Sequence, residues 1–484
     1  MAKRLKSLSG LDAGFLYLEN AGTPMHVGSV MLIEVPAFNR RMSGQTRSKK
    51  KYDFQSELLQ HLQDRLPRAA ALRRVLKETP LDLAHPMWIE TEQVDLKKHV
   101  LKKTLPGNGG MGKLHALTGK LHAALLDRNL PMWQFVVIEN VEPGVIALYS
   151  KIHHALLDGQ GGVALAQVLL DIEAKAPKKA AKKVSSKKTA ELSETPRLRK
   201  RDVTQTALRS TVNQFAKLLR ALPGTLKLAG SISSPSKLKN LRDSILLAPR
   251  TPFNQQISSS RSFATVSVPV DLVKRVARGF NVSLNDVVMA MCGGALREML
   301  KKTRQLPTQS LIAAMPVSLR ESGNTDSNNQ VSMVQCSLAT DIADPVERLQ
   351  AIRASTAQIK MRVATFKNMI PTDFPGLAAP IWASGLSRLW ASGRIAEKLP
   401  PLANVAISNV PGPPIPLYLA GAKLRHYYPV SIVTHGLALN ITVQSYAGSL
   451  EFGITACGDI VRKPEALAAA LSRSLHELNE ILPQ

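Results

Sequence analysis

The stretch that decides the fold reads His153-His154-Ala155-Leu156-Leu157-Asp158-Gly159. The run before it, residues 145–152, is apolar and rich in strand-forming residues, which predicts a β-strand. After it, Leu165, Leu169 and Ile172 recur at helical spacing. The motif is therefore expected in a loop between a strand and a helix, where a rigid scaffold can expose a chemically active side chain.

The residue types of the motif suggest proton transfer. Neighbouring side chains in an extended segment point to opposite faces, so His153 and His154 should not both face one pocket. One imidazole can act as a general base, because it titrates near neutral pH, while the other packs or hydrogen-bonds behind it. Asp158 can orient an imidazole or hold the loop by pairing with an arginine, and Gly159 permits a tight backbone turn.

Other site chemistries have less support in the sequence. Adjacent histidines can also be accidental neighbours or satisfied core residues. A metal site is disfavoured because the two rings diverge and no Cys/His cluster has ligand spacing. The pattern Gly-x-Ser-x-Gly does not occur, so a covalent serine mechanism is not indicated. Three widely separated cysteines fit a reducing compartment and form no paired framework.

The motif resembles the active-site motif of the CoA-dependent acyltransferase superfamily, which includes chloramphenicol acetyltransferases, carnitine acyltransferases and peptide-synthetase condensation domains. The chain more closely resembles the bacterial wax ester synthase/diacylglycerol acyltransferase family. Further matches carry this resemblance: residues 8–15 and 23–28, Pro131-Met132-Trp133, Asn285-Asp286, and residues 408–413 (Ser-Asn-Val-Pro-Gly-Pro). Met132 stands where the family has leucine. The two-histidine motif alone identifies the superfamily, whereas the set together is specific for the family.

The resemblance implies an α+β fold with two chloramphenicol-acetyltransferase-like domains around a central tunnel, which CoA and acceptor enter from opposite mouths. It implies an acyl-CoA-dependent O-acyltransferase that passes a long-chain acyl group to a fatty alcohol or diacylglycerol, making wax esters and triacylglycerols for storage. His154 would be the general base, supported by His153, and transfer would be direct, without an acyl-enzyme. Acyl-CoA would be a co-substrate, with no permanently bound cofactor and no metal.

The remaining motif residues have structural as well as functional interpretations. The resemblance gives tunnel or structural roles to Pro131, Trp133, Asn285, Asp286, Asn409, Pro411 and Gly412. Asn285-Asp286 follows a serine at a helix start, which favours N-terminal capping over catalysis. Trp133 precedes a strand and is expected in the core or in a tunnel wall. The proline-rich loop after Asn409 either shapes a substrate channel or is a structural turn.

The charge of the chain favours anionic partners. Its 63 Lys and Arg exceed its 36 Asp and Glu, which gives a formal net charge of +27. Such an excess suits CoA phosphates or membrane headgroups. Residues 175–201 hold 11 Lys/Arg and 2 Glu, and form either a solvated loop or an anion-binding segment. Because this segment has no aromatic residues, nucleic acid is not an expected partner.

Composition divides the chain into four parts. We expect an N-terminal acyltransferase domain at residues 1–173, a basic flexible linker at 174–203, a helical connector at 204–255 and a C-terminal acyltransferase-like domain at 256–484. The connector begins with an amphipathic helix over residues 204–222. This helix either docks on a lipid surface or packs between the two domains.

The sequence predicts no membrane-spanning segment, because no apolar run approaches 18 residues and the N-terminus lacks the apolar core of a signal peptide. We therefore expect a cytoplasmic protein, peripherally associated with the inner membrane face or with lipid inclusions such as droplets. Two alternatives remain open. One is a condensation or N-acyl transfer enzyme that uses the same motif. The other is a non-catalytic lipid-surface binding protein, which explains the charge but not the motif set.

Hydrophobic periodicity gives the expected order of elements. The predicted strands are residues 27–35, 133–138, 145–152, 263–270, 311–317, 331–340, 405–408, 422–428, 437–445 and 450–456. The predicted helices are residues 54–76, 114–125, 271–278, 284–301, 344–362 and 464–481. The two halves thus have similar lengths and similar mixtures of helix and strand.

Overall fold

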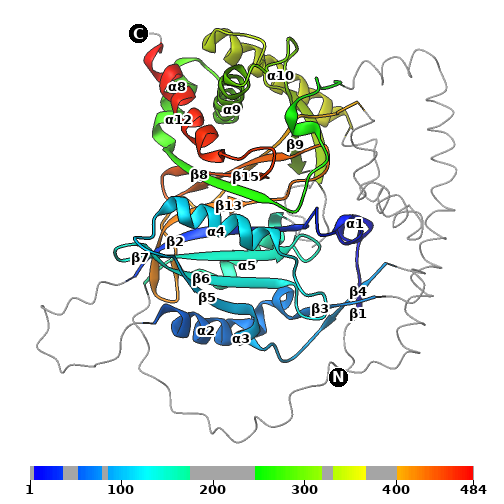
Figure 1. Cartoon of the computed structure of the whole chain (residues 1–484), viewed down its shortest axis with the longest axis vertical. Coiled ribbons are helices and arrows are strands. Elements are labelled where there is room, and N and C mark those ends of the chain that lie inside the picture. Colours follow the sequence, from blue (N-terminus) through cyan, green and yellow to red (C-terminus); the bar gives the residue numbers. More distant parts are fainter. Residues whose placement is uncertain are drawn as a thin grey trace, which may run out of the picture.

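The fold is taken from a computed structural model of the chain (Figure 1). The structure describes residues 5–35, 53–78, 85–157, 159–174, 246–318, 331–366 and 400–482. The expected linker, the amphipathic helix of the connector and Asp158 lie outside these residues. The described part is a mixture of helices and sheets, which confirms the predicted α+β class.

The first half of the chain builds its sheet around an apolar hairpin. β6 (Trp133–Glu142) and β7 (Val145–His153) run antiparallel and join through a turn at Pro143 and Gly144. Gly144 in this turn has a φ of +74°, a conformation that favours glycine. β2 (His26–Glu34) pairs antiparallel with β7, and β5 (Val100–Thr104) pairs parallel with β6.

Two strands from far along the chain complete this sheet. β12 (Tyr418–Leu419) and β13 (Ala422–Val430) extend it to the order β12-β13-β2-β7-β6-β5. β13 runs antiparallel to β2, with Tyr428 opposite Val30. The C-terminal part expected at residues 256–484 therefore contributes a strand pair to the first sheet. Periodicity identifies a strand and its buried face but not its partner, so this exchange could not be predicted from the sequence.

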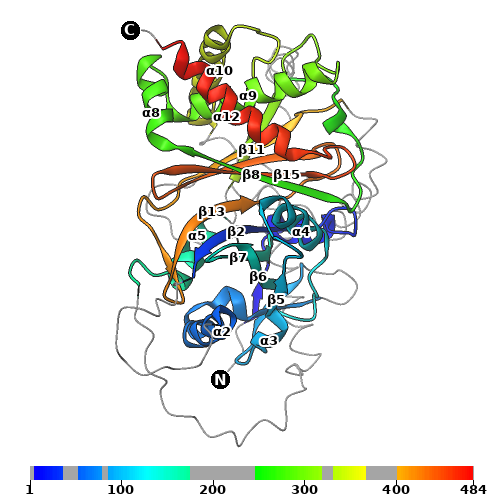
Figure 2. The same cartoon turned by 60° about the vertical axis from the view of Figure 1, so that its left-hand side comes forward.

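The second half forms another six-stranded sheet, in the order β10-β9-β11-β14-β15-β8. Its strands are β8 (Arg261–Pro269), β9 (Ile312–Ser318), β10 (Val331–Ser337), β11 (Val405–Val410), β14 (Leu439–Tyr446) and β15 (Ser449–Cys457). Its helices are α8 (Val270–Gly279), α9 (Leu284–Lys302), α10 (Pro345–Phe366) and α12 (Pro464–Glu480). Figures 1 and 2 show these helices on the side of the sheet that faces away from the first half.

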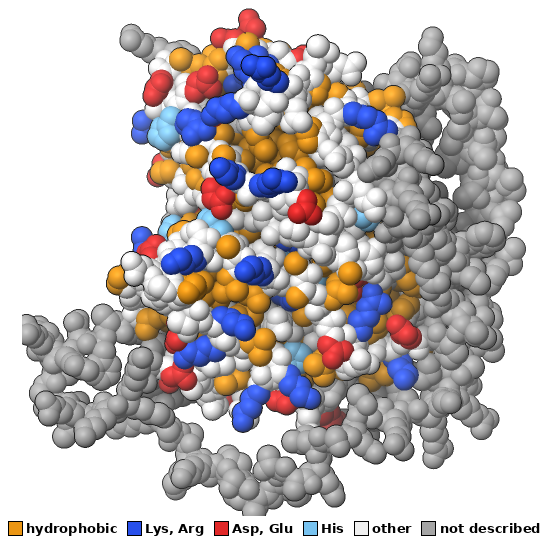
Figure 3. Space-filling view, in the orientation of Figure 1, with side chains coloured by type: hydrophobic (Ala, Val, Ile, Leu, Met, Phe, Trp, Pro, Cys, Tyr) orange, Lys and Arg blue, Asp and Glu red, His pale blue; other side chains and the backbone are white. Residues whose placement is uncertain are grey.

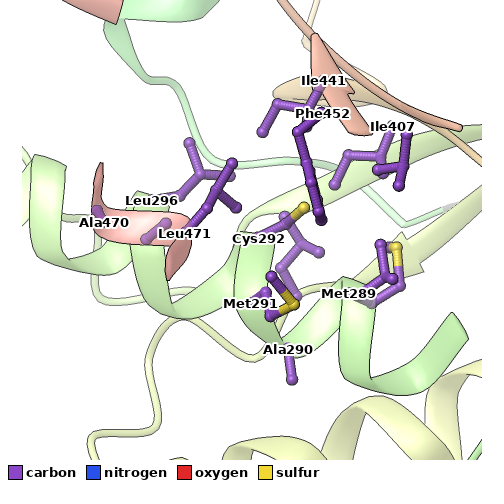
Figure 4. Close-up of a cluster of buried hydrophobic side chains, with 14 of the residues drawn as sticks. Met289, Ala290, Met291, Cys292, Leu296, Ile407, Ile441, Phe452, Ala470 and Leu471 are labelled. Atoms are coloured by element: carbon purple, nitrogen blue, oxygen red, sulfur yellow. The ribbon is translucent and has the colours of Figure 1, made fainter. Parts of the chain in front are cut away.

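The core of the second half lies between this sheet and helix α9. Met289, Cys292 and Leu296 of α9 pack with Phe452 of β15 and Leu471 of α12 (Figure 4). Each of these side chains is at most 1% exposed. Because α9 buries residues on most of its circumference, it serves as the central helix of this half.

Shorter elements flank the first sheet. They are α1 (Gly10–Leu18), α2 (Phe54–Arg65), α3 (Leu96–His99), α4 (Met111–Ala123), α5 (Gly159–Leu169), and a separate sheet of β1 (Leu5–Ser7), β4 (Met87–Glu90) and β3 (Arg74–Lys77). The helix predicted over residues 54–76 was too long. It ends at Arg65 because Pro67 lacks a backbone donor and disfavours helix in the residue before it.

The two halves meet across α4 and β13. α4 packs against β8, and β13 packs against β14 and β15 (Figure 2). His122 of α4 donates a hydrogen bond from Nε2 to the carbonyl oxygen of Ser431, 2.9 Å away. Arg261 of β8 donates one to the carbonyl oxygen of Gly22 at 2.7 Å. The second bond joins the segment before β2 to the first strand of the second half.

The face shown in Figure 3 carries Lys and Arg side chains interspersed with apolar ones over both halves. Within the described residues, no helix is long and apolar enough to cross a membrane.

Candidate active site

The two-histidine motif begins at the last residue of β7, a strand whose nine residues are all buried. The backbone of His153 is held from two sides. Its N–H donates to the carbonyl oxygen of Met132 at 3.0 Å, and its own carbonyl accepts from the N–H of Leu156 at 2.9 Å. His26 lies opposite it in β2. The backbone at the start of the motif is therefore held in place by the sheet and by the residues next to it.

The ring of His153 points into the protein and is 0% exposed. Its Nδ1 accepts a hydrogen bond from the backbone N–H of Ala155, at 3.1 Å. A neutral imidazole that accepts at Nδ1 carries its proton on Nε2. Nε2 lies 3.3 Å from Oε1 of Glu19, so the proton faces a carboxylate. This pairing fixes both the tautomer and the orientation of the ring.

Glu19 follows helix α1 and connects several groups around the motif. Its side chain is 2% exposed, and its oxygens accept from the backbone N–H of Met25 at 3.2 Å and from Arg128 at 3.1 Å. Burial raises the pKa of Glu19, but His153, the Met25 N–H and Arg128 outweigh it and lower the pKa to about 2. Glu19 is therefore a carboxylate at neutral pH.

His154 occupies a different environment from His153. It lies in the turn after β7 and is only partly buried. Its backbone N–H donates to the carbonyl oxygen of Met25 at 2.9 Å. Its ring stacks on that of Phe15 in α1, with centroids 4.0 Å apart and planes 16° apart. The two histidines thus have separate surroundings, as extended backbone predicts.

The run Pro131-Met132-Trp133 supports the end of β7. Met132 is fully buried and supplies the carbonyl that holds the backbone of His153. Trp133 is 1% exposed, donates from Nε1 to the carbonyl oxygen of Leu72 at 2.9 Å, and stacks on His99 at 4.2 Å. Trp133 is therefore a core residue with its polar atom satisfied, which is the structural interpretation of this motif.

The family model described as the wax ester synthase/diacylglycerol acyltransferase catalytic domain matches residues 8–288, and that of the WS/DGAT C-terminal domain matches residues 327–479. The chain belongs to the wax ester synthase/diacylglycerol acyltransferase family. The predicted identification as an acyltransferase of this family is confirmed.

Individual relatives match along nearly the whole chain. A probable diacylglycerol O-acyltransferase of Mycobacterium tuberculosis is 33% identical over 475 residues, which cover 97% of this chain and 98% of the relative. O-acyltransferase WSD of Acinetobacter baylyi is 32% identical over 487 residues, with coverages of 97% and 96%. The solved wax ester synthase/diacylglycerol acyltransferase of Marinobacter aquaeolei VT8 has 29% identity and a TM-score of 0.68, with coverages of 98% and 99%. The starter condensation domain of rhizomide synthetase, at 13% identity and a TM-score of 0.52 with coverages of 99% and 94%, shares the fold alone.

In this family member, the N-terminal run at residues 23–28 braces β7 from the neighbouring strand. His26 is fully buried and donates from Nε2 to the carbonyl oxygen of His122, at 2.9 Å. Burial, with smaller contributions from His122 and Lys151, lowers the pKa of His26 well below its usual value. A Cβ atom at Gly28 would lie 1.8 Å from the carbonyl oxygen of Ser150, so only glycine fits there.

A buried lysine lies on β7 beside this run. Nζ of Lys151 donates to the carbonyl oxygens of Leu121 and Ala124, at 2.9 and 2.8 Å, at the end of helix α4. A positive charge is favourable at a helix C-terminus. Burial lowers the pKa of Lys151 to about 8, although Glu19 opposes the shift. Lys151 therefore anchors α4 to the strand that carries the motif.

The C-terminal motifs meet each other in the second half. Asn285 and Asp286 begin α9, where Ser283 and Asp286 form a capping box. Oδ1 of Asp286 also accepts from the Thr356 hydroxyl at 2.6 Å. Asn409, near the end of β11, donates from Nδ2 to Oδ1 of Asn285 at 3.4 Å. The Asn-Asp pair therefore caps a helix and contacts the other C-terminal motif.

The turn after β11 is closely packed. Pro411 follows the last residue of the strand and lacks the donor needed to continue the ladder. The N–H of Gly412 donates to the Ser445 hydroxyl at 2.8 Å, and a Cβ atom there would lie 2.0 Å from the Ser445 carbonyl oxygen. These contacts are those of a structural turn.

Sequence reasoning missed two residues of the site, Phe15 and Glu19. Both come from α1 and the residue after it, and their spacing of one helical turn brings them to the two adjacent histidines. That spacing after a family-specific N-terminal run was the available signal. Gly159 is the first residue of α5, where a tight turn was predicted. Among the residues that the structure describes, no cluster of His, Cys, Asp and Glu has the geometry to hold a metal ion.

Proposed function

We propose that this chain transfers a long-chain acyl group from acyl-CoA to a fatty alcohol and to diacylglycerol, making wax esters and triacylglycerols for storage. The observation that carries the proposal is the end of β7, where two adjacent imidazoles lie in separate environments within a chain that both family models match. Both acceptor classes come from the relatives, which include a probable diacylglycerol O-acyltransferase and a wax ester synthase/diacylglycerol acyltransferase.

In the proposed mechanism, His154 is the general base, since it is only partly buried whereas His153 is 0% exposed. It takes the proton of the acceptor hydroxyl as that oxygen attacks the thioester carbonyl carbon. A C–O bond forms, the C–S bond breaks, and the imidazolium returns its proton to the CoA thiolate. No acyl-enzyme is required. General-base assistance of this kind contributes a factor of about 10² to 10⁴, and holding the two substrates together contributes further.

The remaining motif residues support this step. His153, held by Glu19 and the Ala155 N–H, fixes the backbone from which His154 projects. In the proposal Asp158 organises the loop, and Gly159 allows the turn into α5. Trp133 and Asp286 are structural, as their buried contacts suggest.

Acyl-CoA is proposed as a co-substrate that leaves as free CoA after each turnover. Both acceptors are nearly insoluble in water, so we propose that the enzyme collects them at the inner membrane face or at a lipid inclusion. The net charge of +27 supports this location. Each Lys or Arg near an anionic lipid surface contributes about 1 kcal/mol to binding.

The proposal is tested by incubating the purified chain with palmitoyl-CoA and one acceptor at a time: hexadecanol, dipalmitoylglycerol or hexadecylamine. Release of free thiol and the lipid product are both followed. Ester formation with the first two acceptors is expected, and amide formation as the main activity would instead indicate an N-acyl transfer enzyme. Thiol release with no acceptor-dependent product would contradict an acyltransferase role.

The general base is tested by His154→Ala, with His476→Ala as the matched control because His476 is exposed on α12. His154→Ala is expected to lose at least the roughly 10²-fold that a general base supplies. The control is expected to retain wild-type turnover. If His154→Ala kept more than about a tenth of wild-type thiol release, a loss smaller than any general base accounts for, the assignment would be wrong.

A further inference from the structure

We propose that Phe15 is a positioning residue for His154: its ring holds the imidazole in the plane from which it accepts the acceptor's proton. This inference rests on the proposed function, because it takes His154 as the general base. Phe15 lies outside the two-histidine motif and reaches it from the N-terminal helix α1.

The helix that carries Phe15 is firmly held. Ser9 caps its N-terminus, with Oγ accepting from the N–H of Asp12 at 3.1 Å. Ala13 and Leu16 on the same helix are buried in the core of the first half, at 0% and 3% exposure. A ring that projects from such a helix is a stable surface against which another ring can be oriented.

The segment after α1 also holds the backbone of His154. The carbonyl oxygen of Met25 accepts from the backbone N–H of His154, and the Met25 N–H in turn donates to Oε1 of Glu19. The backbone of His154 and its ring are thus both fixed by one continuous piece of chain, residues 15–25. A shift of α1 would move the imidazole and its backbone together.

A phenyl ring suits this role for chemical reasons. The terminal torsion of a histidine side chain is broad, so a partly buried imidazole such as that of His154 can rotate unless its neighbours restrict it. A general base must lie within roughly 2.6–3.2 Å of the atom that carries the proton it removes. The stack at 4.0 Å restricts the ring through its face and takes neither ring nitrogen, since a phenyl group has no hydrogen-bonding atom. The same face also favours the imidazolium that forms during the reaction.

The experiment compares Phe15→Leu with Phe15→Tyr in the full-length chain, with palmitoyl-CoA and hexadecanol as substrates. Phe15→Leu keeps an apolar side chain but removes the stacked ring, so kcat is expected to fall roughly tenfold, less than the 10²-fold that a misplacement of about 1 Å can cost. KM for both substrates is expected to stay near its wild-type value. Phe15→Tyr restores the ring and is expected to recover most of kcat.

The matched control is Phe263→Leu. Phe263 on β8 packs edge-on against His115, belongs to a different hydrophobic cluster from the residues of the motif loop, and is 2% exposed. The Phe263→Leu substitution is expected to lower the melting temperature at least as much as Phe15→Leu does, while leaving kcat near its wild-type value. A KM increase with unchanged kcat in Phe15→Leu would show that Phe15 contacts substrate instead and would overturn the proposal.

A second readout does not depend on turnover. In the protein labelled with ¹³C at histidine Cε1, the His154 signal is assigned by its loss in His154→Ala. The stacked ring is expected to shift this signal upfield in the wild type and in Phe15→Tyr but not in Phe15→Leu. If Phe15→Leu is fully active while His154→Ala is inactive, the proposed role of Phe15 is wrong and the proposed function still stands. An active His154→Ala would overturn the proposed function itself.

Discussion

Nε2 of His153 lies 3.3 Å from Oε1 of Glu19, and the two side chains are only 0% and 2% exposed. The pair joins the N-terminal helix to the strand end that carries the motif. Because Nδ1 of the same ring is already occupied by the Ala155 N–H, the carboxylate faces the protonated nitrogen. Glu19 therefore acts on the site through His153 and through Met25, whose carbonyl oxygen holds the backbone of His154.

Glu19→Gln is expected to remove a pH-dependent part of the stability. The pKa of Glu19 is lowered from 4.5 to about 2 in the folded protein, so the carboxylate stabilises the fold above pH 4.5 and loses this effect as the pH falls to 2. The shift corresponds to about 3 kcal/mol. Urea unfolding should therefore show a difference in the free energy of unfolding between wild type and variant that is largest near neutral pH and becomes smaller in acid.

Glu90→Gln is the control for this comparison, because Glu90 pairs with Arg73 at 3.4 Å but its side chain is 36% exposed. Its effect is expected to be within about 1 kcal/mol, as for other exposed ion pairs. If the difference in the free energy of unfolding between wild type and Glu19→Gln stayed constant from neutral pH to acid, the carboxylate would not be held ionised by its partners.

His153→Ala and His154→Ala are expected to differ in kind. His153 is buried and its loss removes one of the partners of the buried Glu19 carboxylate, so His153→Ala should lower the free energy of unfolding by about 1–3 kcal/mol. His154→Ala should fold with near wild-type stability and lose turnover. Thermal unfolding and single-turnover rates on the same preparations separate the two effects. Reversed behaviour, with a stable and inactive His153→Ala, would make His153 the base.

The local elements around the motif were predictable from sequence because each depends on a short-range pattern. The hairpin of β6 and β7 follows from two apolar runs joined by Pro-Gly, and α9 from Ser283 and a long apolar repeat. The divergence of His153 and His154 follows from the period of an extended chain. The family resemblance then supplied the fold class and the enzyme class.

The features that could not be predicted from the sequence depend on long-range contacts. Nothing in the pattern of residues 422–430 indicates pairing with β2 in the other half of the chain. Apart from its spacing of one helical turn from Phe15, Glu19 gave no signal, because its importance comes from burial beside His153 and Arg128. Phe15 appeared as one apolar residue of a family-specific run, and its contact with His154 required the fold.

Gly28→Ala is expected to disrupt the strand pair that supports the motif. A Cβ atom there would lie 1.8 Å from the Ser150 carbonyl oxygen and 3.3 Å from Cα of Lys151, and neither backbone atom can move without shifting β7. We expect a loss of about 3 kcal/mol or more in the free energy of unfolding, at the upper end of overpacking effects, together with reduced kcat.

Gly112→Ala in α4, where a Cβ atom would meet nothing within 4 Å, is the control and should be neutral or slightly stabilising. A Gly28→Ala variant with wild-type melting temperature and kcat would show that β2 and β7 adjust freely, against the close packing described above.

Asp286→Ala tests whether the Asn-Asp motif is structural or catalytic. Asp286 is 4% exposed; its Oδ2 accepts from the Ser283 N–H at 2.8 Å, and its Oδ1 accepts from the Thr356 hydroxyl. Loss of the cap and of a buried acceptor should together cost about 2–3 kcal/mol, while kcat of the folded fraction stays near wild type. Asp271→Ala, an exposed first-turn aspartate of α8, controls for the loss of charge and should be nearly neutral. Asp286→Asn keeps an acceptor for Thr356 and should recover part of the stability. A variant of wild-type stability whose kcat falls by about 10² or more, the factor that proton-transfer groups contribute, would place Asp286 in the chemistry instead.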